Sequence, residues 1–214
     1  MINVVYEDNH LLVVRKPANT PICLDSSKDK DLLTEAKEYI KEKYNKPGEV
    51  YLGMVHRLDR PVEGLVVFAR TSKAASRLSK QIQENKFKKT YLAVVYDNNL
   101  KDSDELIDYL VKDPNTNIVK VSKEGKKAIL NYSVIKRKDN LALVKIDLKT
   151  GRSHQIRVQF SSRNHPLWGD QKYNANAKEK EQIALFASEL EFEHPTTKEK
   201  LCFKINIDRY PFNL

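Results

Sequence analysis

The sequence predicts an α+β protein built on a mixed, mainly antiparallel sheet with flanking helices. Strand-like segments outnumber helical ones, and several neighbouring strands are separated by turns short enough to form hairpins. No glycine-rich phosphate loop follows any predicted strand, which disfavours the nucleotide-cofactor folds. The 214 residues, 40% of them hydrophobic, have the composition of a globular protein. We therefore expect a single domain over residues 1–214, without an internal repeat or a long linker.

The chain is predicted to begin with a hairpin and a surface helix. Two apolar segments, 4–6 and 11–14, are separated by a polar turn, which is typical of a β-hairpin. From Leu32 to about Tyr44 the apolar residues fall at helical spacing. Asp31 precedes this segment and is a suitable N-cap, so we expect a helix to begin immediately after it.

A buried strand and a second helix are expected next. The apolar run 64–69 is short and rich in valine, which favours a strand over a helix. Ser72 is a candidate N-cap for the helix that follows. Helical spacing then places Ala75, Leu78 and Ile82 on its inner face.

The remainder of the chain is predicted to be mostly sheet. Strand-like segments occur at 89–96, 106–111, 128–135, 141–148, 185–192 and 201–207. Segment 153–163 is ambiguous, because Ile156 and Phe160 fit one face of a helix and, together with Val158, also fit a strand.

The net charge favours an anionic partner. Thirty-eight Lys and Arg residues against 29 Asp and Glu give a charge of +9 and a pI near 9.3. Such a balance suits a nucleic acid, although a solubilising lysine-rich surface would give the same totals. Cys23 and Cys202 have no histidine at metal-ligand spacing, so we expect reduced thiols and no metal site. Without a secretory signal or an apolar run of 18 residues, we expect a soluble cytoplasmic protein with no membrane partner.

Asp59 is the first candidate for chemistry. It lies between Arg57 and Arg60, just before the predicted strand 64–69. Neighbouring guanidinium groups stabilise an ionised carboxylate, as a nucleophile requires, and other cations there could hold phosphates. The same pattern also fits an ordinary surface ion-pair cluster, which is the commoner reason for such a charge run.

Two further segments carry candidate site residues. Segment 151–158 contains Arg152, His154, Gln155 and Arg157, whose donors suit phosphates and base edges. If this segment is helical, Arg157 can point inward to pair with a buried carboxylate; otherwise it is a basic surface. On the strand 89–96, alternation places Tyr91 on the opposite face from its neighbours, where it serves either the core or a site.

Taken in order along the chain, these segments resemble the RluA family of RNA pseudouridine synthases. The resemblance covers almost the whole chain. It rests on segments 6–8, 16–17, 56–60 (HRLDR) with Gly64, 89–91 (KTY), 152–158 (RSHQIRV), 165–167 (HPL) with Gly169, Asp170 and Tyr173, and 193–195 (EHP). Several ordered motifs at fitting distances are far more specific than any one alone.

The resemblance implies a single catalytic domain of the pseudouridine synthase fold, with a central cleft that admits a flipped uridine. Asp59 would be the nucleophile. Tyr91 would stack on the uracil and act as the base, while Arg157 would pair with Asp59 and hold the base. Lys16, Arg57, Arg60, Arg152, His154 and Gln155 would contact the RNA. The reaction, which breaks the N1–C1′ bond and rejoins the base through C5, implies neither a cofactor nor a metal, and base flipping suits the cations and the aromatic ring.

Some positions depart from the family pattern. Segment 61–63 reads Pro-Val-Glu where relatives have Asp-Thr and a small residue, which changes the turn after Asp59 without removing it. Arg15 replaces a frequent asparagine, and Ser153 replaces a threonine but keeps the hydroxyl. The S4 RNA-binding module of many relatives has no counterpart, so we expect the basic surface to select the RNA.

We therefore predict an isomerase that converts specific uridines, in ribosomal RNA more readily than in transfer RNA, and that acts as a monomer. One alternative is a non-catalytic RNA-binding or ribosome-assembly factor, which would not need Asp59, Tyr91 and Arg157 together. Another is a metal-dependent nucleic-acid hydrolase, which lacks a second carboxylate at convincing spacing beside Asp59. The target uridine and the choice between a covalent and a ribose-derived intermediate stay open.

Overall fold

The chain folds into two compact units. The structure, a computed structural model, describes residues 2–25 and 28–214, and within them it has three helices and a mainly antiparallel sheet, which confirms the predicted fold class. Unit 1 comprises Met1–Lys88 and Glu189–Ile205, and unit 2 comprises Lys89–Ser188 and Asn206–Leu214. The single domain expected over residues 1–214 stays a prediction. Among the described residues, no helix has the length and apolar character needed to cross a lipid bilayer.

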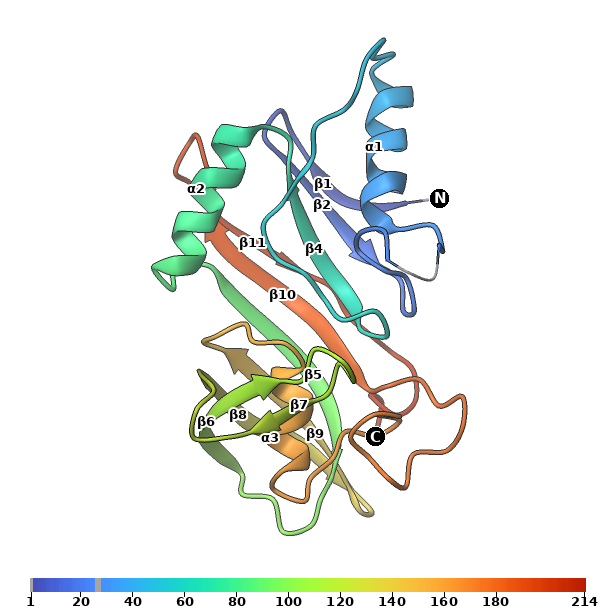
Figure 1. The fold of residues 1–214 in the computed structure, drawn as a ribbon, viewed down its shortest axis with the longest axis vertical. Helices are drawn as coiled ribbons and strands as arrows, with labels where there is room; N and C mark the ends of the chain where they lie inside the picture. The colour runs from blue at the N-terminus through green and yellow to red at the C-terminus, as the bar shows by residue number, and fades with distance from the viewer. Residues whose placement is uncertain (1, 26–27) are drawn as a thin grey trace. The chain divides into compact units, whose positions relative to one another are not determined.

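Unit 1 contains the N-terminal strands and the first two helices. Its elements are β1 (Asn3–Glu7), β2 (Leu11–Lys16), α1 (Leu32–Lys43), β3 (Gly53–Met54), β4 (Glu63–Ala69), α2 (Ser72–Gln83), β11 (Lys200–Lys204) and the end of β10 (Leu185–Glu193). The antiparallel order β1-β2-β4 confirms the predicted hairpin and buried strand, and α1 and α2 flank these strands (Figure 1). Leu11 and Val13 of β2 pack with Val67 of β4 and Leu78 of α2 in one apolar core.

Helix α1 begins where the sequence predicts. Asp31 has an extended backbone, and its Oδ1 accepts a hydrogen bond from the Thr34 N–H at 3.0 Å. The side chains of Tyr39 and Lys43 donate to Glu7 of β1, at 2.9 and 2.7 Å. These contacts attach the helix to the first strand.

Helix α2 is capped by Thr71, and the prediction of Ser72 as its cap is wrong by one residue. Thr71 has the extended backbone of an N-cap, and its hydroxyl accepts from the Ala74 N–H at 3.1 Å. Ser72 is already the first helical residue. Of the predicted inner-face residues, Leu78 is buried, and Ala75 and Ile82 are partly buried against the same apolar core; Ala74 and Gln81 are buried as well.

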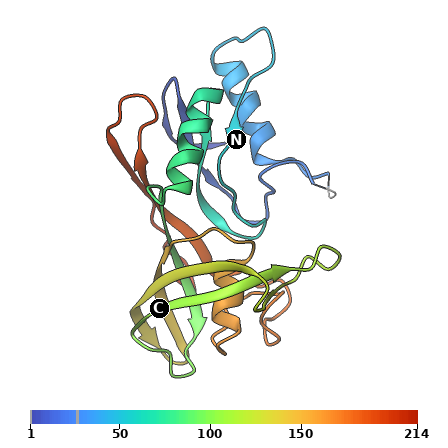
Figure 2. The same ribbon diagram turned by 60° about the vertical axis from the view of Figure 1, so that its left-hand side comes forward.

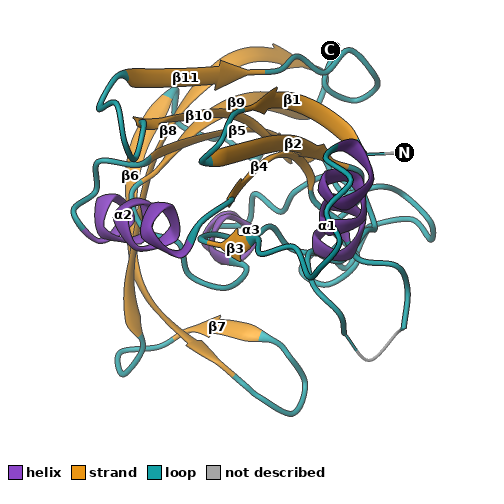
Figure 3. Ribbon diagram, turned by 90° about the horizontal axis from the view of Figure 1, so that it is seen from above, coloured by secondary structure: helices purple, strands orange, loops and turns teal. Residues whose placement is uncertain are grey.

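Unit 2 is a curved sheet with one short helix. Its elements are β5 (Lys88–Tyr96), β6 (Ser103–Lys112), β7 (Val119–Val121), β8 (Lys126–Lys138), β9 (Leu141–Leu148), α3 (Gln155–Ser161) and the start of β10. The order is β10-β5-β9-β8-β6-β7, the strands curve about α3 (Figure 2), and β7 lies along the far end of β6 (Figure 3). The ambiguous segment 153–163 is therefore a helix. Its residues 155–160 are all buried, so no amphipathic pattern could identify it.

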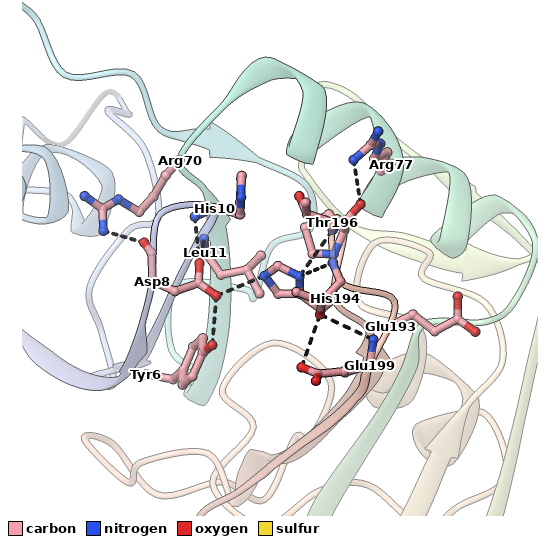
Figure 4. Close-up of polar contacts among 12 residues, drawn as sticks. Tyr6, Asp8, His10, Leu11, Arg70, Arg77, Glu193, His194, Thr196 and Glu199 are labelled. Atoms are coloured by element: carbon pink, nitrogen blue, oxygen red, sulfur yellow. Dashed lines mark hydrogen bonds and ion pairs between the residues drawn. The ribbon is translucent and has the colours of Figure 1, made fainter.

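A polar network around Asp8 joins the first hairpin of unit 1 to the turn after β10 (Figure 4). The Asp8 Oδ2 lies 2.9 Å from His194 Nε2 and accepts from the Tyr6 hydroxyl at 2.8 Å. His194 Nδ1 faces the backbone N–H groups of Thr196 and Thr197 at 3.2 and 2.9 Å. Because Nδ1 must accept from them, the ring proton lies on Nε2 and is donated to Asp8.

Candidate active-site residues in the two units

Asp59 is carried by a tight turn that leads into β4 of unit 1. The Val62 N–H donates to the Asp59 carbonyl oxygen at 3.0 Å, and the neighbouring Leu58 side chain is buried. Asp59 itself is half-buried. Gly64, at the entry to β4, has a φ of +134°, a conformation that residues with a side chain rarely adopt. A glycine there is thus part of the local structure that holds the turn.

Lys16 supports this turn from within unit 1. Its side chain is 0% exposed, and Nζ donates to the carbonyl oxygens of Pro17, Thr20 and Arg60 at 3.0, 2.7 and 2.8 Å. Burial lowers the pKa of Lys16 to about 7, although the negative charge of Asp59 opposes the shift. Since Arg60 follows Asp59, Lys16 fixes the backbone beside the candidate nucleophile.

The two arginines beside Asp59 are both exposed. Arg60 forms ion pairs with Asp29 and Asp25, the second with an N–O distance of 3.5 Å, and its side chain is 40% exposed. Arg57 lies on the surface of the same loop. Cations with this exposure are accessible to a polyanion, and Asp25 and Asp29 compete with that polyanion for Arg60.

The departures from the family pattern at 15 and 63 contact each other. Arg15 Nε donates to Glu63 Oε1 at 2.9 Å, and the terminal NH2 group contacts the same oxygen. Glu63 closes the Asp59 turn, and Arg15 precedes Lys16 on β2. The Arg15–Glu63 pair therefore connects the two segments that support Asp59.

Tyr91 lies on β5 of unit 2, where it pairs in register with Ile146 of β9. Its side chain is buried, as is that of Lys89 two residues earlier on the same face of the strand.

Arg157 on α3 makes a buried ion pair with Asp170. Its Nε and NH2 donate to the two carboxylate oxygens at 2.8 and 2.6 Å, and the side chains are 6% and 0% exposed. The buried carboxylate expected from helical spacing is thus Asp170, which takes two of the five guanidinium donors. The Tyr173 ring centroid lies 5.1 Å from the guanidinium carbon. The pairing of Arg157 with Asp59 stays a prediction.

His154 immediately precedes α3 and is held by Tyr173. The Tyr173 hydroxyl accepts from the Val119 N–H at 2.9 Å and lies within hydrogen-bond distance of His154 Nδ1, at 2.7 Å. His154 has a φ of +50°, a left-handed conformation uncommon outside glycine, so this position is held by its surroundings.

Gln155 is buried, and its amide shapes the loop before α3. Its Oε1 accepts from the Thr150 hydroxyl and the Arg152 N–H at 2.8 and 3.0 Å, and its Nε2 donates to the Ile129 carbonyl at 3.1 Å. Arg152 is exposed, and its Nε donates to the Lys127 carbonyl at 2.9 Å. Gln155 thus supports the loop that carries Arg152.

Sequence reasoning assigned no role to Lys89, Asp170 or Tyr173. The last two belong to a family signature, but no periodic pattern marks them as partners of Arg157 or His154. In the described ranges, 2–25 and 28–214, no three His, Cys, Asp or Glu side chains cluster as metal ligands.

Comparisons with known proteins identify the family. The model of the family described as RNA pseudouridylate synthase matches residues 10–162. An uncharacterized RNA pseudouridine synthase of Aquifex aeolicus (strain VF5) is 35% identical over 217 residues, which cover 95% of this chain and 69% of that protein. Ribosomal large subunit pseudouridine synthase C of Buchnera aphidicola subsp. Schizaphis graminum (strain Sg) is 33% identical over 97% of this chain and 68% of its own.

The solved structures agree in fold. Human RNA Pseudouridylate Synthase Domain Containing 4 has a TM-score of 0.82 at 20% identity, covering 99% of this chain and 90% of that chain. The family match favours the catalytic interpretation over a non-catalytic RNA-binding or assembly factor. The chain belongs to the RluA family of RNA pseudouridine synthases and is an isomerase that acts on RNA.

Proposed function

We propose that Asp59 is the nucleophile with which this enzyme isomerises uridine in RNA. The glycosidic N1–C1′ bond breaks, the detached uracil rotates, and a C5–C1′ bond replaces it. The Asp59 carboxylate assists the first step by attacking the nucleotide or by stabilising a ribose-derived intermediate. Tyr91 stacks on the uracil and acts as the base, and Arg157 holds the uracil while it rotates.

The observation that carries this proposal is the support built under Asp59 in unit 1. The turn at Val62, the buried Lys16 and the Arg15–Glu63 pair all hold the few residues around Asp59. A surface carboxylate in an ordinary ion-pair cluster does not need a buried lysine bonded to the backbone of the residue beside it. Preorganisation of this kind is what a catalytic group requires.

The unit 2 residues have a comparable support. Asp170 fixes the guanidinium of Arg157 from two sides, and the His154–Tyr173 hydrogen bond fixes the loop before α3. A bidentate pair leaves the arginine little rotational freedom. This geometry supports a positioning role for Arg157 toward a planar base.

For RNA binding, we propose direct contacts by Arg57, Arg60 and Arg152. The arginines are exposed, and cations of this kind neutralise phosphates. Lys16, His154 and Gln155 are buried and bonded to backbone or neighbouring groups, so their contribution runs through the loops that they support.

As substrate, we propose ribosomal RNA of the large subunit. Several relatives at 29–33% identity are named ribosomal large subunit pseudouridine synthases C or D, and the net charge of +9 suits a large polyanion. The same proposal has the enzyme working in the cytoplasm as a monomer, with both units acting as one catalytic domain.

The test is a pseudouridine map of total RNA from wild-type cells and from cells lacking this gene. Loss of one or more signals in the large-subunit RNA would support the proposal, and loss confined to transfer RNA would overturn the substrate. Complementation with Asp59→Asn should not restore the signal. The matched control is Asp139→Asn, an exposed turn residue with a φ of +55° that asparagine tolerates, which should restore it fully.

A further inference from the structure

Lys89 is a buried cation with no counter-charge among the described residues. It is 8% exposed and lies on β5, two residues before Tyr91. In the part of the chain that the structure describes, its ammonium has no carboxylate or hydrogen-bond acceptor as a partner. Burial alone lowers the pKa of Lys89, and no neighbouring charge opposes the shift. Burying an unpaired charge costs folding free energy, so a lysine in such surroundings is a candidate for a functional role.

The other buried lysine of the chain shows what a structural role looks like. Lys16 places its ammonium among three carbonyl oxygens, which satisfy its three donors. Lys89 is also buried, although it keeps 8% exposure against 0% for Lys16, and among the described residues it lacks any such acceptor. The contrast indicates that the partner of Lys89 is not among the residues that the structure describes.

The position of the Lys89 ammonium indicates which kind of ligand it can bind. Lys89 Nζ lies against the backbone of Gly151, where an added Cβ would be only 3.2 Å from it. Gly151 precedes Arg152 in the loop that Gln155 holds in place. Lys89 therefore lies beside a loop whose next residue is an exposed arginine, and the two cations are within unit 2.

Lys89 is also close to Tyr91, the residue on which the uracil is proposed to stack. Alternate residues of a strand share a face and are separated by about 6.6 Å along it. Lys89 and Tyr91 are such a pair, and both are buried. A ligand at Lys89 is then a neighbour of a base stacked on Tyr91.

We propose that Lys89 binds a phosphodiester of the RNA substrate next to the target uridine. This inference rests on the proposed role of Tyr91 and adds a specific anion contact to it. A compact ammonium without a counter-ion favours an anion over a neutral carbonyl, and the anion of RNA is the phosphate. Gly151 leaves the room that the ammonium occupies.

The test measures binding in an Asp59→Asn background, so that no chemistry intervenes. The probe is a fluorescent 12-nucleotide single-stranded RNA with one central uridine, followed by anisotropy over a range of salt concentrations. Lys89→Met should weaken binding about tenfold and reduce the slope of log affinity against log salt by about 0.7, the value for one phosphate contact in single strands. Lys145→Met is the matched control, because Lys145 is exposed and pairs in register with Leu92, on the other face of the sheet.

Two further measurements separate a phosphate contact from a structural role. Replacing the phosphodiesters that flank the uridine by neutral methylphosphonates should weaken binding to the parent protein but leave Lys89→Met almost unaffected. The melting temperature of Lys89→Met should be equal to or higher than that of the parent, because a buried unpaired charge is removed.

Equal losses for Lys89→Met and Lys145→Met, or equal sensitivity of the parent and Lys89→Met to the neutral linkages, would overturn the proposal. A fall in melting temperature without a change in binding would assign Lys89 a structural role instead. Pseudouridine formation by Asp59→Asn would refute the proposed nucleophile. It would not affect the conclusion about Lys89, which depends only on the binding measurements.

Discussion

Removing the Asp170 carboxylate should strongly destabilise unit 2. The Arg157 side chain is 6% exposed in the wild type. In the Asp170→Ala variant, its guanidinium would stay buried without the carboxylate that accepts from two of its donors. Removing one partner of a buried ion pair costs about 3–5 kcal/mol. Asp170 also accepts from the N–H groups of Lys172 and Tyr173 at 3.0 and 3.2 Å, which adds roughly 1 kcal/mol. We expect a total loss of about 4–6 kcal/mol.

Urea denaturation followed by circular dichroism measures this loss. For a chain of this size, each 1 kcal/mol corresponds to about 2–4 °C in melting temperature, so the expected fall is roughly 8–24 °C. Asp139→Asn, which alters an exposed turn residue whose φ of +55° asparagine tolerates, should change the free energy of unfolding by no more than about 0.5 kcal/mol. A loss below about 1 kcal/mol for Asp170→Ala would refute the view that this pair holds Arg157 in place.

Other predictions concern unit 1. The folded-state pKa of Lys16, about 7, lies below its unfolded value near 10.4, so the unfolded chain binds more protons between them. Between pH 7 and about 10, the free energy of unfolding of the wild type should therefore rise relative to that of Lys16→Met, by up to about 1.4 kcal/mol per pH unit. Urea titrations at several pH values measure this difference, and a difference that does not change with pH would contradict the prediction. Glu63→Arg should slow single-turnover conversion about tenfold, and the exchange Arg15→Glu with Glu63→Arg should recover most of it; no recovery would exclude the pair as a support. Burial opposes ionisation of Asp8, but its hydrogen bonds outweigh burial and lower its pKa, so its contribution is present at neutral pH and lost as the pH falls below about 4. Asp8→Asn should cost about 1–2 kcal/mol at pH 7 and progressively less as the pH falls below about 4, and a cost that does not change with pH would argue against an ionic role.

Local signals predicted the elements whose stability is local. The first hairpin and the Asp31 cap follow from turn residues and capping chemistry that involve neighbours in sequence. The cap of α2 was misplaced by one residue because Thr71 and Ser72 have the same capping chemistry. Helix α3 stayed ambiguous because it is buried on all sides, so no polar face distinguished it from a strand.

The candidate site was predictable only in part, because the contacts that support it join residues far apart in the sequence. The charged segment around Asp59 stands out in the sequence, but the support beneath it comes from Lys16, which is 43 residues away along the chain and bonded to carbonyl oxygens that no motif identifies. Likewise, the Asp170 carboxylate reaches Arg157 through tertiary packing. Lys89 resembles any surface lysine in sequence, and only its burial makes it notable.

Whether Asp59 carries out the reaction is tested most directly by single-turnover conversion. The substrate is an RNA fragment containing the uridine that the pseudouridine map identifies, and both proteins are used at concentrations that saturate it. Asp59→Asn should bind this RNA with near wild-type affinity and form no detectable pseudouridine, whereas Asp139→Asn should convert it at the wild-type rate. Conversion by Asp59→Asn at a rate close to that of the wild type would contradict the assignment of Asp59 as the nucleophile.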